Sequence, residues 1–314
     1  MEQRNQTSEF VLQELFNQTE HEGIIFSILL SMYLLNLLGN LLTALLIRCN
    51  ARLFRTPMYF FLSYLSLADV GFASSTVPMT LRNLVSQNKV ISYAGCLSQM
   101  YFFLLFGNCN NFLFAAMAYD RYLAICRPLH YTALMNQKHC FLVVAGCWFL
   151  AFLHSMLYTL MLSCHSFCAS QEISHFFCDL YPMLEISCSD ITSLKLIAMT
   201  EGMLDILGPF VLVVISYAHI FLTVMKTPST KGKLKALSTC GSHLTVVVLF
   251  YGNLCWVYLR PTSSKSNQNN LASLMYTVVT PMLNPFIYSL RNSEMKGALR
   301  RLVGRMQVSQ KNWK

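Results

Sequence analysis

The charged pair Asp120-Arg121 follows a long apolar run and stands in the stretch MAYDRYLAIC, residues 117–126. A second pair that could take part in chemistry, Glu201 and Asp205, is spaced by four residues, so both carboxylates share one face of a helix. Charged side chains inside a membrane are costly, and for that reason they are usually paired and functional. The chemistry of both pairs therefore depends on what surrounds the elements that carry them.

The composition indicates that these elements cross a membrane. The chain is 54% hydrophobic and only 12% charged, whereas a globular domain carries about 25% charged residues. A helix needs about 20 residues to cross roughly 30 Å of hydrocarbon, and apolar stretches near this length recur along the chain. They lie approximately at 24–48, 57–81, 96–120, 139–162, 195–225, 236–260 and 271–291. The sequence predicts an all-α membrane protein with a seven-transmembrane helix bundle.

The distribution of basic residues predicts the orientation of the bundle. Lys and Arg favour the cytoplasmic side of a membrane, and most of the 23 in this chain fall in one set of loops. The other set holds only Arg4, Arg82, Lys89, Lys195, Arg260 and Lys265. We therefore expect an extracellular N-terminal tail at 1–23, a transmembrane domain at 24–291 and a cytoplasmic segment at 292–314. The excess positive charge is typical of loops near anionic lipid and does not indicate nucleic-acid binding.

Local features of three segments refine this topology. Gly208-Pro209 in the fifth segment, and Pro281 and Pro285 in the seventh, predict kinked helices. After the seventh segment, apolar residues recur at helical spacing between basic ones, which predicts a short amphipathic C-terminal helix at the membrane surface. Its apolar positions are Met295, Ala298, Leu299, Leu302, Val303 and Met306.

The expected extracellular side carries features of a secreted surface. Two Asn-X-Thr sequons begin at Asn5 and Asn17, of which Asn17 lies closer to the membrane edge, so Asn5 is the better candidate for glycosylation. Cys96 begins the third segment, and the long loop 163–194 contains the further cysteines Cys164, Cys168, Cys178 and Cys188. Disulfides persist on an oxidising face, although spacing alone leaves their connectivity open.

Several motifs, in order along nearly the whole chain, resemble those of rhodopsin-like G-protein-coupled receptors. More narrowly, the chain resembles a vertebrate odorant (olfactory) receptor. The motifs are Gly39-Asn40, TPMYFFLSYLSLAD at 56–69, MAYDRYLAIC at 117–126, Ser216-Tyr217, KALSTCGSHL at 235–244 and PMLNPFIYSLRN at 281–292.

The resemblance implies roles for residues at the cytoplasmic end. Arg121 would be held by Asp120 and by the sixth helix in the inactive state, and released when that helix swings outward to admit a G protein. The residues that the resemblance assigns to activation and G-protein coupling are Asp120, Arg121, Tyr122, Tyr217, Asn284, Pro285 and Tyr288. The alternative interpretation is that Asp120-Arg121 only marks the boundary of the membrane. The flanking motif argues against this interpretation.

The resemblance also implies a ligand cavity among helices 3, 5, 6 and 7, beneath the long outer loop. An apolar wall with a few polar groups suits a small, mostly hydrophobic ligand. The expected ligand-binding residues are Phe103, Leu104, Gly107, Asn108, Glu201, Asp205, Tyr251, Tyr258 and Thr277. Whether Glu201 and Asp205 face the cavity, or bond to neighbouring helices instead, stays open at this point.

Two further expectations come from the same resemblance, and a third comes from residue spacing. Cys96 would pair with Cys178, and Cys168 with Cys188, which restrains the loop. Asp69 is a candidate ion site, but Asn110 stands where related receptors often carry a second carboxylate, so sodium binding is in doubt. His175 and Asp179 flank Cys178, and a disulfide-bonded cysteine is a poor metal ligand, so we expect no metal.

The resemblance implies an odorant receptor in the plasma membrane, not an enzyme, and without a cofactor. It would bind small volatile molecules and activate a stimulatory olfactory-type G protein that raises cyclic AMP. A transporter would show paired repeats or broken helices in matching positions, and a retinal protein would need a lysine in 271–291; the sequence has neither. For an enzyme there is no buried His cluster or glycine loop for phosphate, and His154 is better explained as an interhelical hydrogen-bonding residue.

Overall fold

A computed structural model of the chain describes residues 9–15, 22–86, 88–167, 171–258, 266–290 and 294–301. Its elements alternate long helices with short connecting structures. In chain order they are β1 (Glu9–Leu12), α1 (Glu22–Arg48), α2 (Ala51–Phe54), α3 (Pro57–Val85), β2 (Val90–Ser92), α4 (Tyr93–Cys126), α5 (Tyr131–Leu134), α6 (Gln137–Ser163), β3 (Glu172–Ile173), α7 (Leu180–Glu185), α8 (Thr192–Lys226), α9 (Thr230–Tyr258), α10 (Ser266–Leu274), the π-helix η2 (Met275–Val279) and α11 (Thr280–Leu290). A further helical segment covers 294–301.

In the described part of the chain, seven helical segments form the bundle, as the sequence predicts. Among the described residues, six helices are long and apolar enough to cross a membrane: α1, α3, α4, α6, α8 and α9. The seventh segment is the uninterrupted run of α10, η2 and α11. Helix α8 continues through Pro209, and η2 ends just before Pro281, so the predicted kinks at these prolines stay predictions.

Polar residues at the segment boundaries explain where helices begin. The side chain of Ser92 accepts a hydrogen bond from the backbone of Gly95 at the start of α4, and Asn136 does the same for His139 in α6. Such N-caps satisfy backbone N–H groups that have no partner within the helix. Pro57 occupies the first turn of α3, where its fixed φ and missing N–H cost nothing.

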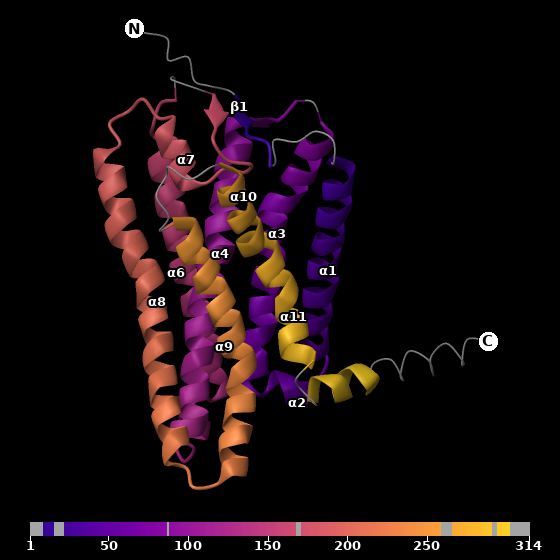
Figure 1. Cartoon of the computed structure of the whole chain (residues 1–314). Coiled ribbons are helices and arrows are strands. Elements are labelled where there is room, and N and C mark those ends of the chain that lie inside the picture. The colour runs from indigo at the N-terminus through magenta and orange to yellow at the C-terminus, as the bar shows by residue number, and fades with distance from the viewer. Residues whose placement is uncertain are drawn as a thin grey trace, which may run out of the picture.

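Helix α4 lies at the centre of the bundle (Figure 1). It packs against α3, α6, α8 and α9. The interior is filled by large apolar side chains such as Phe61, Phe72 and Phe114, all fully buried. One helix therefore runs through the core from the end that carries β1 to the end that carries residues 294–301.

The outward faces of the helices are apolar. Leu38 on α1 is 67% exposed and Leu204 on α8 is 74% exposed, and many other large apolar side chains on these helices are exposed as well. A soluble protein rarely shows a continuous apolar surface of this extent. Hydrocarbon is the solvent that suits it, and helices satisfy their backbone hydrogen bonds internally, as a membrane requires.

A small sheet closes the end of the bundle that carries the N-terminal segment (Figure 1). Its strand order is β2-β1-β3, with β1 antiparallel to β2 and parallel to β3. Phe10 and Leu12 of β1 point into an apolar cluster and are almost fully buried. The N-terminal segment therefore joins the loop before α4 to the loop between α6 and α8.

The helix at 294–301 lies across the opposite end of the bundle (Figure 1). Met295 and Ala298 are buried, whereas Leu299 is 38% exposed. This fits the predicted amphipathic helix as far as it is described. Its predicted apolar residues Leu302, Val303 and Met306, like the sequons at Asn5 and Asn17, lie outside the described residues.

Candidate functional site

A cavity of about 290 Å³ opens between α4, α6, α8 and α9, near the end of the bundle that carries the sheet. Phe72 of α3, Tyr276 of η2 and the segment Asp179–Tyr181 complete its wall. Most of its lining is apolar, which is typical of sites for small organic molecules. The cavity is near the lower limit of such sites, so its occupant must be small.

Five of the predicted ligand-binding residues line this cavity: Phe103, Leu104, Gly107, Asn108 and Asp205. Their spacing explains the grouping, because 104, 107 and 108 fall on one face of α4. Three others, Glu201, Tyr251 and Thr277, do not line it. The side chain of Tyr258 lies outside the described part of the chain.

Glu201 instead joins α8 to α6 through hydrogen bonds. Its Oε1 lies 2.9 Å from Nδ1 of His154, and its Oε2 accepts a hydrogen bond of 2.6 Å from the hydroxyl of Tyr158. Both carboxylate oxygens therefore have partners. His154 is an interhelical hydrogen-bonding residue, as predicted, but it also lines the cavity.

Asp205 differs from Glu201 in its surroundings. Its side chain is 8% exposed, and its Oδ1 lies 3.7 Å from Nδ1 of His154. The Asn111 amide donates to the backbone carbonyl of Asp205 at 2.8 Å, and Tyr251 donates in turn to Oδ1 of Asn111. Tyr251 thus supports the cavity from behind its wall, through Asn111.

The loop between α6 and α8 is fastened over this end of the bundle. Cys96 is disulfide-bonded to Cys178 with a Cα–Cα distance of 5.5 Å, which is the pairing that the resemblance implies. Cys188 is also disulfide-bonded, but Cys168 lies outside the described residues. The backbone N–H of Cys178 donates to the side chain of Gln99 at 2.9 Å, so the loop is held by polar contacts too.

His175 fixes the same loop to the seventh helical segment. Its Nε2 lies 3.1 Å from Oγ of Ser273 on α10, and the backbone of Phe177 donates to its Nδ1 at 3.4 Å. Burial lowers the pKa of His175 to about 4, so the ring is neutral at physiological pH. Within the described chain, no group of three or more His, Cys, Asp or Glu residues could hold a metal ion.

At the other end of the bundle, α4 carries the Asp120-Arg121 pair. Asp120 is fully buried, and its Oδ2 lies 3.2 Å from a guanidinium nitrogen of Arg121. Its Oδ1 accepts a hydrogen bond of 2.7 Å from the hydroxyl of Tyr131 on α5. Burial, followed by the nearby carboxylate, raises the pKa of Tyr131 above its ordinary value, so the phenol remains a donor.

Comparison with known proteins settles the family. A sequence model described as olfactory receptor matches residues 29–306. The chain is 50% identical to human olfactory receptor 1F1 over 307 residues, 98% of each chain. It is also 50% identical to human olfactory receptor 1J4 over 98% of each chain, and to mouse olfactory receptor 1J1 over 97% of each. The chain belongs to the olfactory receptor family.

In this olfactory receptor, two of the residues that the resemblance assigns to activation, Tyr217 and Tyr288, differ in their polar contacts. The Tyr217 hydroxyl lies 2.6 Å from Nδ1 of the buried His243 on α9. Tyr288 is buried, and its hydroxyl has no hydrogen-bond partner in the described part of the receptor. Arg121 makes no hydrogen bond or ion pair with the described side chains of α9. The expected restraint of Arg121 by the sixth helix therefore stays a prediction.

The candidate ion site of the receptor is occupied by amide donors. Asn110 donates to one oxygen of Asp69 at 3.1 Å, and Asn284 donates to the other at 2.7 Å. Asn110, which replaces the second carboxylate, therefore uses its amide to satisfy Asp69. This arrangement joins α3, α4 and α11 through hydrogen bonds to Asp69.

Sequence reasoning missed several residues that line the cavity of the receptor. His154 and Tyr158 on α6, Asn111 on α4, and Phe72 and Tyr276 belong to the wall. Helical spacing was an available signal for Asn111, because it is four residues after Gly107. No comparable signal identified α6 as part of the wall.

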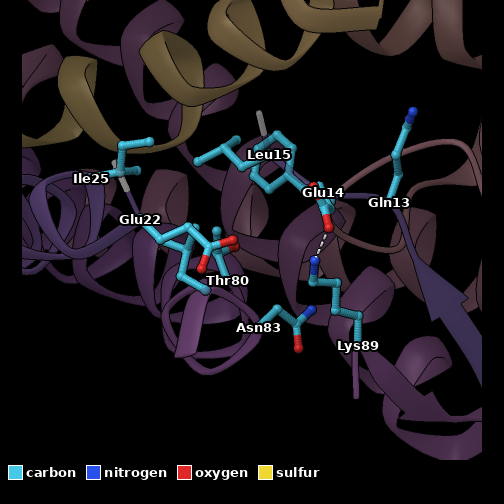
Figure 2. Close-up of a pocket in the computed structure, with 10 residues that line it drawn as sticks. Gln13, Glu14, Leu15, Glu22, Ile25, Thr80, Asn83 and Lys89 are labelled. Carbon is cyan, nitrogen blue, oxygen red and sulfur yellow. Dashed lines mark hydrogen bonds and ion pairs between the residues drawn. The ribbon is translucent and has the colours of Figure 1, made fainter. Parts of the chain in front are cut away.

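A second, much smaller pocket lies beneath the N-terminal segment of the receptor (Figure 2). Glu14 forms an ion pair with Lys89 there, and Asn83 lies beside Lys89. Its volume of about 20 Å³ is close to that of one water molecule. It is therefore too small for an organic ligand, and its ion pair serves to fasten the segment that carries β1.

Proposed function

We propose that this receptor binds small, mostly hydrophobic volatile molecules in the cavity among α4, α6, α8 and α9. We further propose that it activates a stimulatory heterotrimeric G protein and so raises cyclic AMP. The supporting observation is that α4 lines the cavity with Asn108 and Asn111 and carries Asp120 and Arg121 at its other end. A ligand that packs against α4 thus contacts the element that holds the charged pair.

The proposed mechanism is a shift of population between two states. An odorant that binds the active arrangement better than the inactive one raises the share of the active arrangement. Asp120, Arg121, Tyr122, Tyr217 and Tyr288 are the proposed coupling residues, together with Asn284 and Pro285 in the seventh segment. In the active state, the contacts of Arg121 and Tyr217 would rearrange to admit the G protein.

We also propose that the receptor lies in the plasma membrane with its N-terminus outside. The support is the excess of Lys and Arg in the loops at the opposite end of the bundle. Antibody labelling of unpermeabilised cells should detect an N-terminal epitope tag and miss a C-terminal one. Equal labelling of both tags would contradict the orientation.

Signalling should be tested first in cells that express the receptor with an olfactory-type stimulatory G protein. A volatile panel is applied while cyclic AMP is measured, and surface delivery is quantified by the N-terminal tag. Agonists should raise cyclic AMP in a dose-dependent manner. Absence of any response, despite surface delivery and a responsive control receptor, would refute the proposed function.

The position of the ligand is tested by a pair of glycines on α8. Gly202 lines the cavity, and a Cβ there would meet only the Tyr158 hydroxyl, at 3.9 Å. Gly208 does not line it, and a Cβ there would meet nothing within 4 Å. Gly202→Leu should fill the cavity and weaken agonist potency by about tenfold or more, whereas Gly208→Leu should leave potency within about threefold. Equal effects would remove the cavity as the ligand site.

A further inference from the structure

We infer that the cavity selects small apolar amines, whose ammonium group binds the carboxylate of Asp205. This inference rests on the proposed function, because it assigns a ligand class to the proposed ligand site. It follows from how the polar groups around the cavity are paired, and from which one is left to meet a ligand.

Asp205 presents an unpaired acceptor to the cavity. Its side chain is more than nine-tenths buried and lines the wall. No described side chain donates a hydrogen bond to its carboxylate, and the imidazole Nδ1 of His154 lies 3.7 Å away. A buried carboxylate without donors is costly, so a ligand that supplies one gains affinity.

His154 cannot donate a hydrogen bond to Asp205, because its Nδ1 already bonds Glu201. The Nδ1 of His154 lies 2.9 Å from Glu201, well within hydrogen-bond distance, and farther from Asp205. If the imidazole is protonated, its positive charge balances the negative charge of Glu201, and the negative charge of Asp205 remains unbalanced. If it is neutral, both carboxylates remain unbalanced. In either case the negative charge of ionised Asp205 in the wall, and of ionised Glu201 behind it, exceeds the positive charge of His154.

The remaining polar groups do not reverse that charge. The described residues that line the cavity include neither Lys nor Arg. Asp179, a second carboxylate in the wall, accepts a hydrogen bond from the backbone of Leu180 at 2.8 Å and caps α7. The amide of Asn111 is engaged by the Asp205 carbonyl and by Tyr251. A ligand carboxylate would therefore find repulsion here, and an ammonium would find a partner.

The rest of the cavity determines the size and polarity of the remainder of the ligand. Apolar surface of the cavity wall is supplied by Phe103, Leu104, Ile206 and Leu254. The volume of about 290 Å³ limits the occupant to a small molecule. Short alkylamines and phenylalkylamines combine one charged donor group with an apolar body, and so match both parts of the wall.

Binding should be measured directly, on purified full-length receptor in lipid nanodiscs at neutral pH. Two series of equal size serve as probes: hexylamine, 1-hexanol and hexanoate, and 2-phenylethylamine, 2-phenylethanol and phenylacetate. Affinities are taken from the concentration dependence of the melting temperature. At least one amine should bind about tenfold or more tightly than its alcohol, and the two carboxylates should bind weakest. Equal affinities of amines and alcohols, or no binding of either amine, would overturn the inference.

The role of Asp205 is tested by charge removal with a matched control. Asp205→Asn should weaken the affinity for the amine by about tenfold to a hundredfold, the range expected for a hydrogen bond between charged groups. It should change the affinity for the alcohol by less than about threefold. Asp190→Asn removes a carboxylate charge from an exposed position outside the cavity wall, and the amide oxygen can still accept from Thr192, so it should preserve the preference for amines. An equal loss for amine and alcohol in Asp205→Asn, or loss of the preference in Asp190→Asn, would overturn the assignment.

Two measurements keep the outcome interpretable. The melting temperature without ligand shows whether Asp205→Asn is folded. Asp205→Glu retains the charge and should still prefer amine over alcohol; if it does not, the inference fails. Because binding is measured without a G protein, amine binding with no cyclic AMP response would contradict only the proposed signalling, whereas cyclic AMP responses to alcohols with no amine binding would contradict only this inference.

Discussion

The two ends of the bundle are held together by different kinds of interaction. At the end with the sheet, a disulfide, backbone pairing of β1 with two loops, and hydrogen bonds from Asn270 to the carbonyls of Glu14 and Leu15 join distant segments. At the other end, α4, α5, α8 and α9 are linked by single side-chain contacts such as Tyr131–Asp120 and Tyr217–His243.

Buried polar atoms without a partner sharpen this difference. They occur at both ends of the described chain, but toward the end with Asp120 they lie on Arg121, His243, Asn284 and Tyr288, beside or among the proposed coupling residues. A buried polar atom that lacks a hydrogen bond costs free energy, which a rearrangement that pairs it would recover. The wall of the cavity is therefore already formed, whereas the end with Asp120 retains buried polar atoms that a rearrangement would pair.

The largest expected effect comes from removing the restraint on the loop. Cys96→Ser with Cys178→Ser opens a disulfide whose cysteines are 82 residues apart in the chain, which should cost about 2–5 kcal/mol of stability. We expect a large fall in the melting temperature of the purified receptor, and reduced surface delivery. Cys49→Ser changes an exposed free cysteine at the other end and serves as the control. Similar melting temperatures for both variants would contradict the contrast between the ends.

A smaller effect is expected from the hydrogen bond that holds Asp120. Tyr131→Phe removes the donor at 2.7 Å from the buried carboxylate, which should cost about 1.5–3 kcal/mol. Because Asp120 then holds Arg121 less firmly, cyclic AMP without agonist should rise several-fold. Tyr119→Phe is the control, because Tyr119 precedes Asp120 on α4 and its side chain is exposed. If basal cyclic AMP is the same in both variants, the Tyr131–Asp120 contact does not restrain the receptor.

A third prediction concerns pH at the end with the sheet. Unfolded His175 has an ordinary pKa of about 6.5, and burial lowers its folded pKa to about 4. The unfolded chain therefore binds more protons between these values, and stability falls as pH falls through that window, by up to about 1.4 kcal/mol per unit. Above pH 6.5 this contribution is constant.

The measurement compares melting temperature against pH for the receptor and for His175→Gln. The difference between them should be flat above pH 6.5 and should shrink toward pH 4, as the advantage of the neutral histidine is lost. His139→Gln, at an exposed position, should follow the unchanged receptor throughout. A difference that does not vary with pH would show that His175 does not titrate on unfolding.

The sequence predicts most of the fold, because the thickness of a membrane fixes the length of each apolar helix. The described helix ends differ from the predicted ones by a few residues; α4, for example, begins at Tyr93 instead of Cys96. The sheet was not foreseen. Its strands are two to four residues long and pair across large distances in the chain, so hydrophobic periodicity gives no signal for them.

The candidate site was predictable only in part, for a geometric reason at the seventh segment. The sequence predicts Thr277 at the cavity, but Tyr276 lines it, whereas Thr277 is fully buried and donates to the carbonyl of Ser273. Both lie in the π-helix η2, where a wider turn changes the direction of each side chain from that of an α-helix. A prediction from sequence spacing assumes 3.6 residues per turn, and so it selects Thr277 instead of the neighbouring Tyr276.

The smallest predicted effect tests the close approach of helices near the less restrained end. Gly39 on α1 faces Pro285 on α11, and a Cβ at Gly39 would lie 3.2 Å from Cγ of Pro285. Gly146 on α6 is the matched control, because a Cβ there meets nothing within 4 Å. Alanine in a helix is favoured over glycine by about 1 kcal/mol, so Gly146→Ala should raise the melting temperature slightly.

At Gly39 the same gain is opposed by the contact with the proline ring, so Gly39→Ala should leave the melting temperature unchanged or lower it. Gly39→Val, which adds two further carbons toward Pro285, should lower it clearly. These differences are read from melting curves of the three variants side by side. If Gly39→Ala stabilises the receptor as much as Gly146→Ala does, the contact between a Cβ at Gly39 and the ring of Pro285 does not restrict the packing of α1 against α11.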